Sequence, residues 1–309
     1  MNLLKSPFVR KLVVIGLILL TFGVFAWYVV THPDVVRTIL GLNPIILVLL
    51  TLAYALTILA NGVILHYSLA YVKRRTSMFD NLILTGYSSI VNFFGPLQSG
   101  PGFRAVYLKK KYNIEIKRFL LATFIFYLFF GIINLLVVIL AGVIEKPSWR
   151  PAILLTVVVA AIAAYPLIAI ARRKERIRTL IDSMRLKDKN FWLIGAGALG
   201  LTLSAGLVYL IELHEIAPST NVWQTLVYTA TANLSLFVSL TPGAIGFRET
   251  FLVVSQQLHG IPTDVIITAS VVDRAFYVAF LLVMFVSLLA INGRKKFLLN
   301  VKRPNQQRQ

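Results

Sequence analysis

Residues 241–249 read TPGAIGFRE, and long apolar runs lie on both sides of them. Pro242 lacks a backbone N–H group, and Gly243 and Gly246 permit backbone angles that other residues avoid. A helix that enters this stretch is therefore expected to break there. At membrane depth, a broken helix survives only where protein buries it or where it lines a wet cavity. The stretch thus predicts a broken helical segment, about residues 222–259, beside an internal cavity.

The composition places this break in a membrane. Of the 309 residues, 58% are hydrophobic and 14% are charged, whereas about 25% of the residues of a soluble domain are charged. Uncharged runs of about 18 or more residues are typical of membrane helices. We therefore predict an all-α integral membrane protein in which residues 1–309 form one multi-pass domain. The absence of cysteine excludes disulfides and thiolate chemistry.

The apolar runs predict about six full spans and a second broken segment. This second segment, about residues 79–108, is interrupted at Gly95-Pro96 and at Gly100-Pro101-Gly102. The first apolar run is too long for the core of a signal peptide and is interpreted as a retained span. The six full spans are predicted at about residues 12–30, 44–70, 118–143, 151–171, 191–212 and 264–291.

Lysine and arginine residues set the predicted orientation. Of the 31 basic residues, 25 lie at the N-terminus, in the segments 73–75, 109–118 and 172–189, and in the tail 292–309. Such clusters face the cytoplasm. If the full spans alternate in direction, each broken segment begins and ends on one side, so we predict two re-entrant helical hairpins that enter from opposite faces. Both termini are then cytoplasmic, and the expected location is the plasma (inner) membrane.

The two broken segments also resemble each other in sequence. The triplet Gly102-Phe103-Arg104 matches Gly246-Phe247-Arg248, and an asparagine lies upstream of each triplet, at Asn92 and Asn233. We interpret them as inverted repeats, about residues 79–143 and 222–291, which is the architecture of many secondary transporters. The alternative is a chance resemblance between apolar, glycine-rich stretches.

Two arginines next to the breaks are the first candidates for substrate binding. A charge at membrane depth is costly and usually faces the bundle interior, and a guanidinium group suits phosphate or carboxylate. The freed N–H groups of the helices after each break would add to such a site. For Arg104 the alternative is snorkelling beside Lys109, and for Arg248 it is a structural ion pair. The full predicted binding set is Arg104, Arg248, Pro101, Gly102, Pro242, Gly243, Gly246, Asn92 and Asn233.

Three further charged residues lie in the second repeat. Asp273 and Arg274 fall about ten residues into the last predicted span, and Glu249 follows Arg248 directly. Asp273 is placed to pair with Arg248 across the hairpin. Glu249 and Asp273 are candidates either for proton coupling or for static charge compensation, and the sequence does not separate these two roles.

Several other motifs do not indicate function. Residues 195–200 read GAGALG and match a dinucleotide-binding pattern, but they lie inside an apolar run without a preceding strand, where close helix packing explains them. The four histidines show no metal-ligand spacing, so we expect no metal and no cofactor. The net charge is +19, and the basic residues responsible for it flank the apolar runs. This arrangement fits contact with anionic lipid headgroups rather than nucleic acid.

The sequence around both breaks resembles a known family. Residues 241–249, and residues 100–109 with the sequence GPGFRAVYLK, are similar to the flippase-like family related to the transmembrane region of lysylphosphatidylglycerol synthases. That family shows a Pro-Gly-x-x-Gly-x-x-Glu pattern, which Pro242, Gly243, Gly246 and Glu249 match. The resemblance covers most of the chain and implies translocation of a lipid or handling of a lipid-linked sugar.

The first repeat departs from the family pattern. The family often has an acidic residue before its arginine and a Glu-Arg pair in the following span, whereas Phe103 and Phe126-Tyr127 stand at these positions. Any coupling chemistry carried over from the family is therefore in doubt for the first repeat.

We predict a protein that is not an enzyme and that moves an anionic phospholipid or lipid-linked headgroup across the bilayer. One alternative is an accessory membrane subunit of an envelope glycolipid or lipid-modifying pathway, with a lipid-modifying enzyme or a glycosyltransferase as its partner. The other alternative is an intramembrane lipid or sugar transferase, which is disfavoured because few polar residues could perform chemistry.

Overall fold

The computed structural model describes residues 41, 43–74, 76–95, 99–145, 148, 151, 185–239 and 241–295. These residues form helices and connecting turns, with no strand among them. The main elements are α3 (Pro44–Tyr71), α4 (Met78–Phe94), α5 (Gly100–Tyr112), α6 (Ile116–Glu145), α9 (Lys189–Ile216), α10 (Val222–Ser235), η4 (Pro242–Ala244), α11 (Phe247–Val254), α12 (Gln256–His259) and α13 (Thr263–Lys295).

Four of the described helices are long and apolar enough to cross a membrane: Pro44–Tyr71, Ile116–Glu145, Lys189–Ile216 and Thr263–Ile291. They correspond to four of the six predicted spans, with ends that extend a few residues beyond the predicted ones. The predicted span 12–30, all of the predicted span 151–171 except its first residue, and most of the tail lie outside the described residues. Large apolar side chains on these helices are exposed, among them Val48, Leu136 and Val283, as expected for surfaces that face lipid.

Both predicted helix breaks are present. In the first broken segment, α4 ends at Phe94, Gly95 is extended, and α5 begins at Gly100. In the second, α10 ends at Ser235, and the backbone then passes through positive φ angles of 59° at Gly243 and 83° at Gly246 before α11 begins. Ala244 also has a positive φ of 56°. Gly243 and Gly246 therefore adopt backbone angles that other residues avoid, as the sequence predicts.

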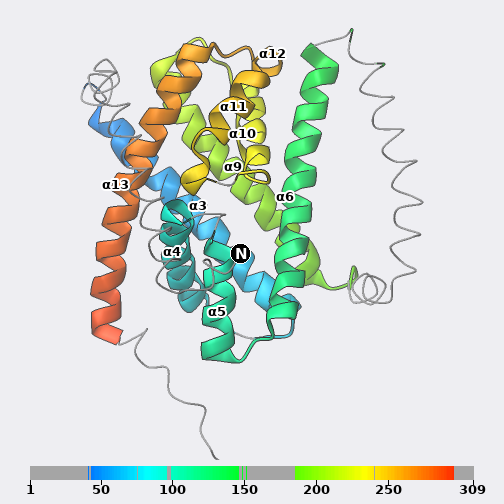
Figure 1. Ribbon diagram of the computed structural model, residues 1–309, viewed down its shortest axis with the longest axis vertical. Helices are drawn as coiled ribbons and strands as arrows, with labels where there is room; N and C mark the ends of the chain where they lie inside the picture. The colour runs from blue at the N-terminus through cyan, green and yellow to red at the C-terminus, as the bar shows by residue number, and fades with distance from the viewer. Residues whose placement is uncertain are drawn as a thin grey trace, which may run out of the picture.

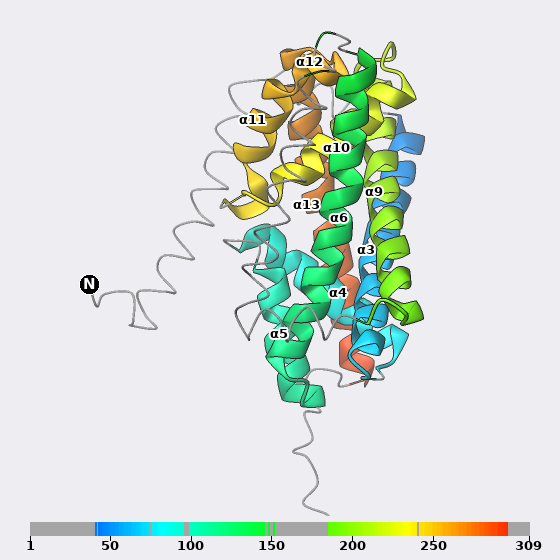
Figure 2. The ribbon, with the colours of Figure 1, turned by 90° about the vertical axis from the view of Figure 1, so that its right-hand side faces the viewer.

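The two broken segments occupy opposite halves of the molecule. Figures 1 and 2 show α4 and α5 in the lower half and α10, α11 and α12 in the upper half, whereas α6 and α13 run along most of its length. The breaks themselves lie near mid-height, where the halves meet. Each half has its own apolar core. The lower core includes Leu69, Leu108 and Ile194, and the upper core includes Tyr228 and Leu252.

Gly100 permits the close approach of α5 to α4. A Cβ atom at Gly100 would lie 2.8 Å from the carbonyl oxygen of Ser88 and 2.9 Å from Cβ of Asn92. A Cβ atom at Gly102, two residues later on the same helix, would meet nothing within 4 Å.

We predict that Gly100→Ala destabilises the protein by about 1–3 kcal/mol, because overpacking of this size strains the surrounding backbone. Gly102→Ala is the matched control and is expected to be neutral or stabilising by about 0.5–1 kcal/mol, since alanine favours helix. Thermal unfolding of both variants in detergent measures the difference. Equal losses of stability in the two variants would contradict the close contact.

Candidate functional site

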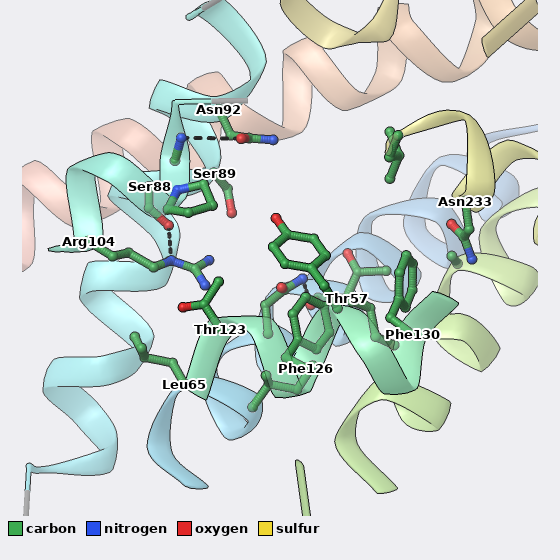
Figure 3. A pocket seen from close by; sticks show the side chains of 18 of the residues that line it. Thr57, Leu65, Ser88, Ser89, Asn92, Arg104, Thr123, Phe126, Phe130 and Asn233 are labelled. Atoms are coloured by element: carbon green, nitrogen blue, oxygen red, sulfur yellow. Dashed lines mark hydrogen bonds between the residues drawn. The ribbon is translucent and has the colours of Figure 1, made fainter. Parts of the chain in front are cut away.

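A cavity of about 300 Å³ lies where the two broken segments meet. Its wall contains residues from α3, α4, α5, α6, α9, α10, α11 and α13. The structure brings five residues of the predicted binding set into this wall: Asn92, Pro101, Arg104, Asn233 and Arg248. In Figure 3, Arg104 extends into the pocket from one wall, and Asn233 lies at the opposite wall. Residues from both repeats therefore share one internal space.

Arg104 is a basic residue of α5 that lines the cavity. Its Nε donates a hydrogen bond to Oγ of Ser88 at 2.5 Å, and that hydroxyl donates to the carbonyl oxygen of Thr85 at 3.0 Å. Among the described residues, no carboxylate forms an ion pair with Arg104. Its side chain points into the cavity, which does not fit the alternative of a snorkelling side chain. Arg104 thus brings a positive charge, balanced by no described carboxylate, to the cavity.

Arg248 and Glu249 of α11 are paired with Asp273 and Arg274 of α13. Arg248 binds Asp273 with 2.5 Å between Nη1 and Oδ2, which confirms the predicted pair. Arg274 binds Glu249 with 2.5 Å between Nη2 and Oε1. Since Asp273 and Arg274 are neighbours on α13, the two pairs cross between α11 and α13. The structural alternative given for Arg248 is therefore present, although Arg248 also lines the cavity.

The same charges hold the second break together. Nη1 of Arg274 donates to the carbonyl oxygen of Gly243 at 3.2 Å, and the amide of Gly246 donates to Oε2 of Glu249 at 2.8 Å. Gly243 and Gly246 therefore act through their backbones, and neither lines the cavity. Pro242 begins the short helix η4.

Asn92 and Asn233 have structural bonds as well as a place at the cavity. Oδ1 of Asn92 accepts from the amide of Gly100 at 3.2 Å and so caps the start of α5. Nδ2 of Asn233 donates to Oδ1 of Asn134 at 3.0 Å, and Asn134 in turn donates to Thr202 at 3.2 Å. The expectation of free N–H groups after the breaks is wrong at Gly100 and Gly246, because side chains of the same segments already bind both amides.

Three important residues were missed by the sequence analysis. Glu212 is 2% exposed, and Tyr54 is 4% exposed. The hydroxyl of Tyr54 joins the two acidic side chains, at 3.0 Å from Oε1 of Glu212 and 2.8 Å from Oδ1 of Asp273. The predicted span ended at residue 212, which made Glu212 interfacial, but α9 continues to Ile216 and places it a turn inside. Asn134 is a polar residue in the middle of an apolar run, and this position alone indicates that it needs a buried hydrogen-bond partner.

An apolar groove of about 940 Å³ adjoins the cavity. Leu128, Ile132 and Leu135 of α6 line it, together with Gly102 of the predicted binding set. Four residues belong to both spaces: Pro101, Tyr127, Leu236 and Phe237. The rings of Tyr127 and Phe237 meet edge to face with 5.7 Å between centroids. A thin aromatic partition therefore separates a charged cavity from an apolar groove.

Comparison with models of known protein families gives a match over most of the chain. A family model described as the lysylphosphatidylglycerol synthase TM region matches residues 12–284, which is most of the chain. No curated protein matches the sequence. Among the described residues, no group of three or more His, Asp or Glu side chains could hold a metal ion.

Proposed function

This chain belongs to the lysylphosphatidylglycerol synthase transmembrane-region family, and from that premise we propose that it moves an anionic lipid or lipid-linked headgroup across the bilayer without changing it chemically. The family supports a membrane protein of lipid modification or transport. The choice of transport, and of an anionic headgroup, rests on the cavity described above.

The observation that carries the proposal is that Arg104 lines the cavity without a described carboxylate partner. The guanidinium groups of Arg248 and Arg274 have carboxylate partners, whereas Arg104 has none among the described residues. A guanidinium group that lacks a counter-charge at membrane depth is costly, and an anion in the cavity offsets that cost. Phosphate is well suited because it accepts two parallel N–H bonds from one guanidinium group.

The adjoining groove suits the rest of a lipid. A phospholipid needs a polar space for its headgroup and an apolar surface for its acyl chains at the same time. The cavity and the groove share Pro101, Tyr127, Leu236 and Phe237, so a headgroup beside Arg104 can continue directly into chains that lie along α6. A free soluble anion would make no use of this groove.

We further propose that the two broken segments are re-entrant hairpins of an inverted repeat. Support comes from their positions in opposite halves of the molecule and from the breaks that meet at mid-height. The end of the bundle at which α5 ends and α6 begins carries Lys109 to Lys111, Lys117 and Arg118. By the positive-inside rule we propose that this end is cytoplasmic, with both termini in the cytoplasm and the protein in the plasma (inner) membrane.

Replacement of Arg104 tests the headgroup site. Arg104→Gln is expected to weaken the apparent affinity for fluorescent phosphatidylglycerol in proteoliposomes by about ten- to hundredfold, since hydrogen bonds to charged groups contribute about 1.5–3 kcal/mol. Lys110→Gln makes the same change of charge at an exposed position of α5 and is the matched control. If both variants translocate the lipid as the wild type does, Arg104 is not part of a substrate site.

A bulky side chain tests the groove. Ile132→Trp is expected to slow translocation of long-chain phosphatidylglycerol at least severalfold, because the indole fills space that the acyl chains need. Leu136 lies one turn further along α6, is exposed and does not line the groove, so Leu136→Trp is the control. Glycerol phosphate should still compete for the headgroup site in both variants. Unchanged lipid transport in Ile132→Trp would exclude the groove as the path of the chains.

Single cysteines test the topology, because the natural chain has none. Lys110→Cys and Asp264→Cys are both at exposed positions, on α5 after the first break and in the first turn of α13 respectively. A membrane-impermeant maleimide should label residue 264 in intact cells and residue 110 in sealed inverted vesicles. Labelling of both residues from one side would refute the opposed hairpins.

A further inference from the structure

Glu212 is a buried acidic residue to which the transport proposal gives no role. It lies on α9 behind the cavity wall, and Tyr54 of α3 and Asp273 of α13 stand between it and the cavity. The charged and titratable groups that face it are Arg248 of α11, Tyr228 of α10 and Tyr209 on its own helix, besides Tyr54 and Asp273. Its second carboxyl oxygen, Oε2, is buried and has no hydrogen-bond partner among the residues that the structure describes.

The hydrogen bonds of Tyr54 require a proton on one of the acidic groups. The tyrosine hydroxyl lies 2.8 Å from Oδ1 of Asp273 and 3.0 Å from Oε1 of Glu212, yet it has one proton to donate. When Tyr54 donates to Asp273, its oxygen is free to accept from Glu212 only if that carboxyl is protonated. Asp273 is the ionised member because Arg248 binds it directly. The unpartnered Oε2 fits the same assignment, since burying an unpartnered neutral oxygen costs less than burying a charged one.

The charges of the buried cluster formed by Arg248, Glu249, Asp273, Arg274 and Glu212 also favour a protonated Glu212. Arg248 is balanced by Asp273 and Arg274 by Glu249. An ionised Glu212 would leave one negative charge in excess, because the described part of the chain contributes no third cation to this cluster. A proton on Glu212 makes the buried cluster neutral.

We propose that Glu212 is a proton-binding site that exchanges its proton with the cavity through Tyr54, and that it holds the proton while an anionic headgroup is bound. Release passes the Glu212 proton to the Tyr54 oxygen as the Tyr54 proton moves to a water in the cavity, which leaves Glu212 ionised. An anion in the cavity and a negative charge on Glu212 repel each other, so headgroup and proton favour each other's binding. This coupling rests on the proposed function, whereas the proton site itself does not.

Infrared spectroscopy of the purified full chain tests the proton site without any transport. The wild type should show the carbonyl band of a protonated carboxylic acid that disappears at high pH. Glu212→Gln should lack this band. Glu215→Gln, which changes an exposed residue on the same helix, should keep it. Glutamine preserves the shape of the side chain, and the amide bands report whether the variant is folded. A band that persists in folded Glu212→Gln would overturn the assignment.

Phosphatidylglycerol micelles then test the coupling. They should raise the pH at which the Glu212 band is half lost by a measurable amount, while phosphatidylcholine micelles should leave it unchanged. Tyr54→Phe should retain the band but slow its loss after a pH jump. If phosphatidylglycerol does not change the pH at which the Glu212 band is half lost, in protein that translocates this lipid, the coupling is refuted and the transport proposal stands. If the protein has the Glu212 band but moves no lipid, the transport proposal fails and the proton site stands.

Discussion

The crossed ion pairs between α11 and α13 are the constraint on which the rest of the structure depends. Removing two charges from water costs several kcal/mol per ion, and only close partners and further hydrogen bonds offset that cost. Here Arg248 binds Asp273, and Arg274 binds Glu249 and the carbonyl of Gly243. The cluster therefore supplies partners for a backbone that has left helical geometry at membrane depth. Without it, the second break would present unpaired polar groups to an apolar surrounding.

The two breaks are stabilised by different chemistry, and the difference separates their roles. The first break uses neutral groups: Ser99 donates to the carbonyl of Val91, Asn92 accepts from Gly100, and Ser88 accepts from Arg104. The family often places acidic residues near this arginine, but Phe103, Phe126 and Tyr127 stand there in this chain. No described carboxylate neutralises Arg104 beside the first break. Beside the second break, Arg248 and Arg274 are neutralised by Asp273 and Glu249, and Asp273 also contacts Tyr54.

The sequence predicted those features that depend on local chemistry or on long runs of one residue type. Proline and glycine marked both breaks, hydropathy marked the four described spans, and the depth of Asp273 indicated a partner, which is Arg248. The packing of distant helices was not predictable in this way. Glu212 and Asn134 are single polar residues in apolar helices, and their meaning depends on Tyr54 and Asn233, which lie 158 and 99 residues away along the chain. Nor could the sequence show that the backbone groups of Gly243 and Gly246 bind Arg274 and Glu249 within the break instead of facing the cavity.

The shape of the two joined spaces is the basis on which we propose lipid transport for this chain. An accessory subunit needs neither a buried cation without a described counter-charge nor a groove beside it. Among the described residues, the acidic group in the cavity wall is Asp273, and its ion pair with Arg248 favours a role as counter-charge. A lipid transporter needs a polar space and an apolar space separated by something that can yield. The edge-to-face contact of Tyr127 and Phe237 is such a partition, because no hydrogen bond or ion pair between them has to be broken for the rings to separate.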